Sequence, residues 1–114
     1  MPMLYKIIAA ALWRAAEHDG SFRGSADDLR DGFIHLSTAA QVEETAARHF
    51  AGEDDLLLIS ADAARLGPAL KWEPSRGGAL FPHLYGALDL ADVIRVDPLP
   101  LAASGLHEFP PLDP

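Results

Sequence analysis

Three short stretches of the chain carry side chains suited to hydrogen bonding or proton transfer. They are Asp31-Gly32-Phe33-Ile34-His35-Leu36-Ser37-Thr38, Trp72-Glu73 and Phe81-Pro82-His83-Leu84-Tyr85-Gly86. Imidazole titrates nearest neutrality and acts as a hydrogen-bond donor or general base. A carboxylate at a strand end binds a ribose hydroxyl or polarises a nucleophile. We therefore interpret Glu73 and His35 as candidate catalytic residues, and Ser37, His83, Tyr85 and Arg76 as candidate ligand-binding residues.

Each candidate also has a purely structural interpretation. His35 is equally compatible with a half-buried ring bonded to a carbonyl, and Ser37 with a helix cap. Glu73 is compatible with a solvated edge residue paired with Lys71 or Arg76, and the His83 to Tyr85 segment with a turn fixed by proline. Ser37 lies outside any Gly-x-Ser-x-Gly elbow, which argues against a serine hydrolase.

The first stretch predicts a strand followed at once by a helix. Side chains alternate along a strand, so Ile34 and Leu36 share one face while Phe33, His35 and Ser37 share the other. Thr38 and Gln41 have the spacing of a capping box, which predicts that a helix starts directly after Ser37. Its unpaired N–H groups and positive dipole end would then lie near His35 and Ser37.

The remaining pattern alternates short strands with short helices. We predict strands over 3–8, 56–59, 70–73 and 93–96, helices over 9–18 and 39–50, and helical turns at 25–30 and 62–66. The apolar run at 56–59 is typical of a central strand buried on both faces. Trp13 and Trp72 are expected in the core. The Gly-rich loop 75–78 is expected to be mobile.

Bulk properties limit the classes of function. The chain has 114 residues, 49% of them apolar, which favours one globular domain. With 17 acidic against 9 basic side chains the net charge is −8, which argues against nucleic acid as a partner. No cysteine, secretory leader or membrane-spanning run is present, so we expect a cytoplasmic protein without membrane attachment. We expect a domain over 1–98 and a Pro-rich tail over 99–114, extended or disordered. The oligomeric state is left open.

Several of these residues together resemble a known bacterial family. The string Leu4-Tyr5-Lys6-Ile7, Trp13, the 31–37 stretch with Gln41-Val42, Trp72-Glu73 and the 81–86 stretch look like domain of unknown function 952 (DUF952), over roughly residues 3–98. The resemblance implies a single α+β domain with a split β-sheet core and short helices, similar to ADP-ribosyltransferases. Ile34-His35-Leu36-Ser37 is also similar to a string in NAD-dependent RNA 2′-phosphotransferases.

That resemblance implies a function as well as a fold. It implies binding of NAD, as cofactor, or of an ADP-ribose-like nucleotide as the small-molecule ligand. His35 and Ser37 would contact the ribose or amide, Tyr85 would stack on a ring, Glu73 would steady an oxocarbenium-like centre and His83 would add a polar contact. The chain lacks the transferase His-Gly-Thr string at the first strand, where Tyr5-Lys6-Ile7 stands, and has no Glu-x-Glu pair.

Two other interpretations remain open on the sequence. One is a non-catalytic module that binds a small ligand or a partner protein. The other is a metal-dependent enzyme in which His35, His83 and Glu73 form a two-histidine, one-carboxylate set. The first needs only the polar cluster, whereas the second needs the three side chains to converge on one point.

Overall fold

The computed structural model describes residues 2–114, without the side chain of Arg76. The longer elements are β1 (Met3–Ala9), α1 (Ala10–Asp19), α2 (Ala26–Asp31), α3 (Ala39–His49), β5 (Leu56–Asp62), β6 (Leu70–Pro74), β7 (Leu80–Leu84) and β9 (Val93–Pro98). The shorter ones are β2 (Ser21–Phe22), β3 (Ile34–His35), β4 (Ser37–Thr38), α4 (Ala63–Leu66) and β8 (Leu88–Asp89), with 3-10 turns η1 (Gly67–Ala69), η2 (Arg76–Gly78) and η3 (Leu90–Asp92). This confirms a single mixed α+β domain with several antiparallel sheets. No helix in the described part of the chain is long and apolar enough to cross a membrane.

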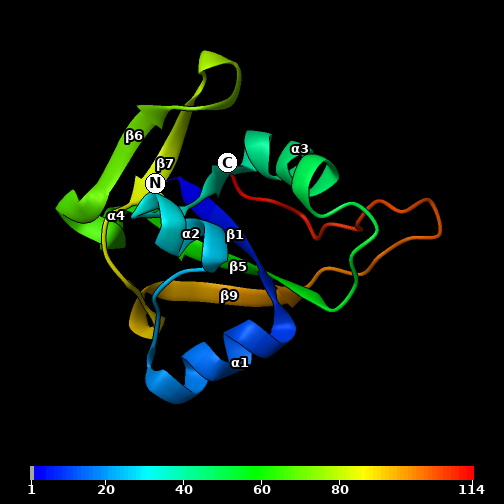
Figure 1. The fold of residues 1–114 in the computed structure, drawn as a ribbon, viewed down its shortest axis with the longest axis horizontal. Helices are drawn as coiled ribbons and strands as arrows, with labels where there is room; N and C mark the ends of the chain where they lie inside the picture. The colour runs from blue at the N-terminus through cyan, green and yellow to red at the C-terminus, as the bar shows by residue number, and fades with distance from the viewer. Residues whose placement is uncertain (1) are drawn as a thin grey trace.

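A four-stranded antiparallel sheet, in the order β4-β1-β5-β9, forms the centre of the molecule. Its two faces are covered by different helices, as Figure 1 shows for α1 and α3. Leu4 and Ile8 of β1 pack with Trp13 of α1, whereas Tyr5 and Ile7 pack with α3. Because side chains alternate between the two faces of β1, this one strand contributes residues to two separate hydrophobic cores. The apolar run predicted as a central strand is β5, which lies between β1 and β9 and extends to Asp62.

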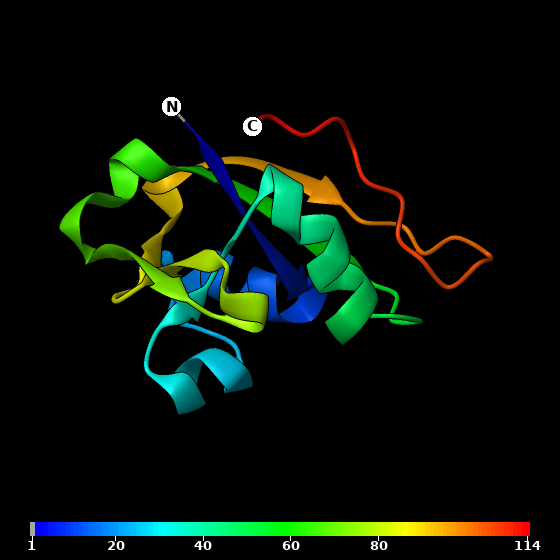
Figure 2. The same cartoon turned by 90° about the horizontal axis from the view of Figure 1, so that it is seen from above.

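A smaller three-stranded sheet, in the order β3-β7-β6, stands beside the first. In Figure 1 the β6–β7 hairpin projects from the body of the molecule, and the view from above in Figure 2 shows it on the opposite side from the red C-terminal segment. Ile34 and Leu36 are buried on one face, which confirms the predicted alternation of this stretch. The hydrogen bond from Leu36 N–H to the Pro82 carbonyl places His35 opposite His83 in a non-hydrogen-bonded pair, where side chains lie closest.

Helix α3 begins directly after Ser37, as predicted. The side-chain oxygen of Gln41 accepts a hydrogen bond from Thr38 N–H at 3.1 Å, and its amide donates to the Leu80 carbonyl at 2.8 Å. The first contact fixes the start of the helix and the second ties it to β7. Val42 and Ala46 form its buried stripe. The chain between β3 and α3 is therefore held from both sides.

The prediction for Trp72 was wrong. Trp13 is buried at 2% exposure, but Trp72 is 43% exposed. Strand β6 lies at the edge of the smaller sheet, and its side chains project above and below that sheet, so their burial depends on what packs against each face. Alternation assigned Trp72 to the face opposite Glu73, but only the tertiary arrangement decides whether that face is covered.

The segment after Pro98 follows the surface of the sheet on the α3 side (Figure 1). It contains one isolated bridge, between Leu101 and His107. Leu99 is buried, and Phe109 and Leu112 pack against the α3 core. The Tyr5 hydroxyl donates to the Asp113 carbonyl at 3.0 Å and accepts from its N–H at 2.8 Å. The end of the chain is therefore seated on β1. The domain boundary at residue 98 stays a prediction.

Candidate functional site

The site is organised around the edge of β1 that β4 leaves open. β4 pairs with β1 only at Leu4 and Tyr5, while β5 pairs with its whole length. The ladder bond from Ala10 N–H to the Asp55 carbonyl shows that the even-numbered residues of β1 bond to β5. Ile7 therefore directs its N–H and C=O toward the open edge. In the described residues, these two groups have no backbone partner on that side.

A cavity of about 620 Å³ lies along this open edge, and we call it the central hollow. Ligand pockets commonly measure about 300–1,000 Å³. Its wall is formed by β1, α2, the β3–β4 strand ends, one face of α3 and β7. The polar and ionisable side chains in that wall include Lys6, Asp28, Asp31, His35, Ser37, Thr45, His49 and His83. The lining residues of α3 come from its body, so its N-terminal amides do not form the wall as the sequence led us to expect.

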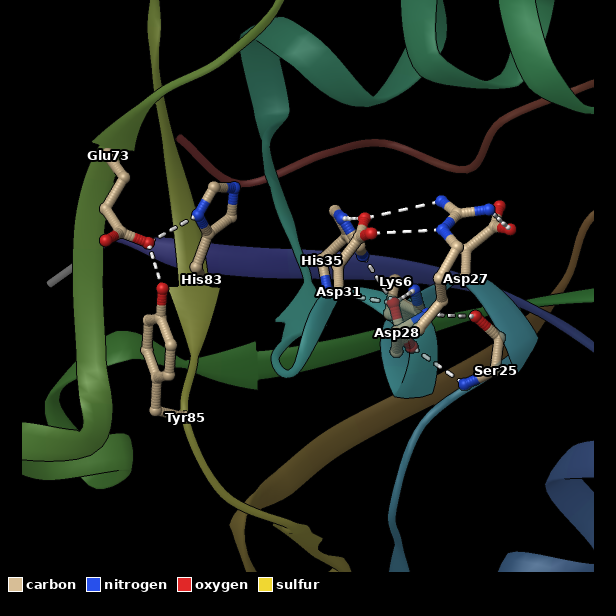
Figure 3. Close-up of polar contacts among 10 residues, drawn as sticks. Lys6, Ser25, Asp27, Asp28, Asp31, His35, Glu73, His83 and Tyr85 are labelled. Atoms are coloured by element: carbon tan, nitrogen blue, oxygen red, sulfur yellow. Dashed lines mark hydrogen bonds and ion pairs between the residues drawn. The ribbon is translucent and has the colours of Figure 1, made fainter.

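Asp28 is the most heavily bonded side chain of this wall. Its carboxylate, 1% exposed, accepts hydrogen bonds from Lys6 Nζ at 3.0 Å and from the Ser25 N–H at 2.8 Å. It also accepts from His35 Nδ1 at 2.6 Å and from the His35 N–H at 3.1 Å. Figure 3 shows these donors gathered around it. Asp28 therefore fixes α2, β1 and β3 relative to one another.

Electrostatics keep Asp28 ionised. Burial by itself would raise the pKa of Asp28, but hydrogen bonds from His35 and Ser25 and the charge of Lys6 outweigh it and hold the pKa well below its ordinary value. Burial lowers the pKa of Lys6, although Asp28 opposes that effect. The two charges thus form a buried pair at the edge of the central hollow.

His35 bonds to two carboxylates of the short helix α2. Its Nδ1 meets Asp28, and its Nε2 lies 2.9 Å from Asp31 Oδ2. The hydrogen bond and the charge of Arg30, with smaller contributions from His35, lower the pKa of Asp31 against the opposing effect of burial. The imidazole therefore lies between two carboxylates of the same helix. His35 therefore anchors α2 to the strand beside it.

Glu73, His83 and Tyr85 form a second hydrogen-bonded group. Glu73 Oε1 accepts from His83 Nδ1 at 2.8 Å and from the Tyr85 hydroxyl at 2.7 Å. The hydrogen bonds from His83 and Tyr85 lower the pKa of Glu73, so this carboxylate is ionised at neutral pH. His83 lines the central hollow, whereas Glu73, which bonds to His83, and Tyr85, which bonds to Glu73, are not among its lining residues. Glu73 can therefore influence a molecule in the hollow only indirectly, through its hydrogen bond to the His83 imidazole.

Phe33 joins the two groups. Its ring stacks on His83 with centroids 4.0 Å apart and planes inclined by 25°, and it lies 4.6 Å from the His35 ring and 5.2 Å from that of Tyr85. The His35 and His83 rings meet edge to face at 5.7 Å. The predicted residues from three distant stretches thus converge on one face of the smaller sheet.

Ser37 also lines the central hollow, but its hydroxyl is engaged. Thr45 Oγ1 donates to the Gln41 carbonyl at 3.2 Å, so the Ser37 hydroxyl donates its proton to Thr45, also at 3.2 Å. What remains at Ser37 is acceptor capacity toward the hollow. The side chain of Arg76 lies outside the part of the chain that the structure describes.

The sequence reasoning overlooked Lys6, Asp28, Asp31 and the backbone of Ile7. Ser25 and Asp28 have capping-box spacing, and both of its hydrogen bonds form, so this signal was readable. Lys6 is the only charged residue in an otherwise apolar strand, which was a second signal. Their contact across 22 positions of sequence separation was not readable, because it arises from the packing of α2 against β1.

The metal set considered from the sequence is not formed. Within residues 2–114, the structure shows no group of three or more His, Asp or Glu side chains placed to hold a metal ion. His35 bonds to the acids of α2, while His83 bonds to Glu73. The two histidines are therefore neighbours with separate carboxylate partners.

Comparison with known proteins places the chain in a family. A family model described as "Protein of unknown function (DUF952)" matches residues 7–96. The chain belongs to this family. A search of curated proteins found no match. The resemblance noted from the motifs is thus confirmed at the level of DUF952.

Solved structures agree with this fold. The crystal structure of protein CC0527 from Caulobacter crescentus has 51% sequence identity, covers 93% of each chain and gives a TM-score of 0.90. A crystal structure of its double mutant has 50% identity with the same coverage and TM-score. The solution NMR structure of CC0527 has 52% identity, a TM-score of 0.84 and covers 93% of this chain and 91% of that one. The two proteins therefore share this fold.

Proposed function

We propose that this DUF952 chain binds a carboxamide-bearing nucleotide of the NAD type in the central hollow, in the manner of an ADP-ribosyltransferase. The observation that carries the proposal is the open edge of β1, where the N–H and C=O of Ile7 face the hollow. A primary carboxamide presents one N–H and one C=O side by side. It therefore pairs with an extended residue through two hydrogen bonds, as a neighbouring strand would.

The wall of the central hollow supports a cationic pyridinium ring next to this amide site. Asp28 and Asp31 line the hollow, and Glu73 stands behind His83. The pKa of each carboxyl lies below its ordinary value, so all three are negative at neutral pH. Asp27 adds a further negative charge to the wall, and the positive charges of Lys6 and Arg30, which also line the hollow, offset only part of this field. The remaining negative charge favours a positive ring over an anionic one.

The candidate residues take roles that follow from their positions. His35, Ser37 and His83 line the central hollow and would contact the ribose or the amide. Glu73 would act on the bound sugar through His83 rather than by direct contact. Tyr85 would support Glu73, because its hydroxyl is bonded to that carboxylate and its ring lies outside the wall. Arg76 remains a proposed ligand contact on sequence alone.

Two dinucleotides that differ in one group test the proposal. Calorimetry with NAD and with its nicotinic acid analogue compares an amide with a carboxylate, which has no N–H to donate to the Ile7 carbonyl. A buried group left without its partner costs about 1–3 kcal/mol, so NAD should bind about 5- to 150-fold more tightly. At about 100 times its dissociation constant NAD should add about 2.7 kcal/mol of stability. Equal affinity for both dinucleotides, or no binding of either, refutes the proposal.

The same edge favours a second candidate, a module that binds an extended peptide as an added strand. Ala9, like Ile7, directs its N–H away from β5, so the edge continues beyond one residue. Ala9 has φ −56, which proline also adopts, so Ala9→Pro removes this N–H without backbone strain. A bound peptide strand needs both residues and should be weakened by the substitution. NAD needs only Ile7 and should keep its affinity.

A further inference from the structure

We propose that His83 is the general base for cleavage of the N-glycosidic bond of the nucleotide bound in the central hollow, with Glu73 as its positioning residue. This inference rests on the proposed function and adds a chemical step to it. The group that the sequence placed at the sugar was Glu73, but the structure places His83 in the wall and Glu73 behind it.

The His83 ring is held on several sides. Glu73 Oε1 lies 2.8 Å from Nδ1, Phe33 stacks on the ring face at 4.0 Å, and the His35 ring meets it edge-on at 5.7 Å. The residue is only 5% exposed, yet it lines the hollow. A ring so confined has one orientation. This is the preorganisation that proton transfer to a bound substrate requires.

The partner of Nδ1 also determines where the imidazole can accept a proton. Glu73 is ionised and can only accept, so the proton of a neutral His83 resides on Nδ1. The lone pair is then on Nε2, which points away from Glu73 in Figure 3. Among the described residues, no hydrogen-bond partner of Nε2 is seen. His83 thus presents a basic nitrogen that Glu73 supports from the other side, the arrangement of a carboxylate–histidine pair.

His35 differs from His83 in this respect. Both of its ring nitrogens face carboxylates, those of Asp28 and Asp31. A ring occupied at both nitrogens has no site for a proton from substrate. Of the two neighbouring histidines, His83 is therefore the one placed to act as a base, and His35 holds the wall of the hollow.

The step balances without any further reagent. The oxygen of a water molecule, or of an alcohol acceptor, attacks C1′ of the ribose, and the bond from C1′ to the pyridinium nitrogen breaks. The electron pair of that bond leaves with nicotinamide, which becomes neutral. The proton of the attacking O–H passes to Nε2 of His83. ADP-ribose, or its glycoside, and free nicotinamide are the products.

The experiment measures nicotinamide release and NAD binding side by side. His83→Gln should lower kcat by about 10²- to 10⁴-fold, the usual contribution of a general base, while the dissociation constant for NAD stays near that of the wild type. Glu73→Gln should lower kcat less than His83→Gln does. It should also alter the kcat–pH profile, because a neutral amide places no negative charge next to Nδ1 of His83. His18→Gln, on the exposed end of α1, is the matched control and should leave kcat unchanged.

Nitrogen NMR of His83 supplies a readout independent of turnover. The wild type should show a protonated Nδ1, and Glu73→Gln should shift the ring toward a mixture of tautomers. NAD binding by His83→Gln confirms that the variant is folded. Wild-type kcat in His83→Gln overturns the inference, as does a wild type that binds NAD but releases no nicotinamide with water or methanol as acceptor. Absence of NAD binding to the wild type refutes the proposed function itself, and the inference with it.

Discussion

Asp28 is predicted to be the side chain on which the stability of the site depends most. In Asp28→Asn the side chain keeps its shape but loses its charge. The amide nitrogen of asparagine cannot accept, so one of the two oxygen positions that now bind Lys6, Ser25 and His35 becomes a donor. Lys6 is then a charged group of 10% exposure without its counter-ion.

The size of the effect follows from this burial. Removing one partner of a buried ion pair costs about 3–5 kcal/mol, because the remaining charge is left uncompensated. The total free energy of unfolding of a domain of this size is about 5–15 kcal/mol. Asp28→Asn should therefore remove a large share of the total. At a urea dependence of about 1–3 kcal/mol per molar, a loss of about 4 kcal/mol lowers the midpoint by about 1–4 M.

The assay is urea unfolding monitored by circular dichroism, and two further variants serve as its controls. Asp27→Asn changes the same residue type in the same helix, but Asp27 is 74% exposed and pairs with Arg30 at the surface, so it should cost less than about 1 kcal/mol. Adding Lys6→Met to Asp28→Asn removes the orphaned charge and should recover part of the loss. If Asp28→Asn and Asp27→Asn cost the same, the reasoning about the buried pair is refuted.

Three further predictions follow. The pKa of Asp28 is lowered in the folded chain, so the stabilisation from its carboxylate is present above the unfolded pKa of about 3.9 and is lost as the pH falls below it. The free energy of unfolding should therefore fall more steeply with acid in the wild type than in Asp28→Asn. Parallel curves for the two proteins would contradict this. Gly24→Ala would place a Cβ 2.8 Å from Asp28 Cβ, at a backbone φ of +129, and should lower the free energy of unfolding in urea by at least about 1–3 kcal/mol. Gly105→Ala is the control, because nothing lies within 4 Å of its added Cβ, and it should cost less. Equal losses would show that crowding at Asp28 is unimportant. Tyr5→Phe removes both hydrogen bonds to Asp113 and should lower the free energy of unfolding by about 1–3 kcal/mol. It should also speed amide hydrogen exchange at Asp113. Unchanged exchange would show that these bonds do not hold the end of the chain.

Local patterns in the sequence were sufficient for the elements that carry the candidate residues. The alternation from Phe33 to Ser37 predicted which side chains share a face, and the Thr38 and Gln41 spacing predicted where α3 begins. These features depend on neighbours within a few positions along the chain. For the same reason the run at 56–59 was readable as a central strand, since burial on both faces leaves it no polar alternation.

The contacts that turn these elements into a site depend on distant parts of the chain. The Lys6–Asp28 pair requires α2 to pack against β1, and the Glu73–His83 contact requires the β6–β7 register. The same is true of Trp72, whose exposure depends on whether another part of the chain packs on its face of the smaller sheet.

The sequence by itself therefore determined the mixed α+β elements, the family motifs and the polar residues that meet. Tertiary structure alone decided that β4 stops pairing at Tyr5, which leaves Ile7 facing a cavity, and that His83 rather than Glu73 lines it. The physical reason is that side-chain periodicity is a property of a single strand. Strand-edge pairing and cavity shape depend instead on how far each neighbouring strand extends before it turns away.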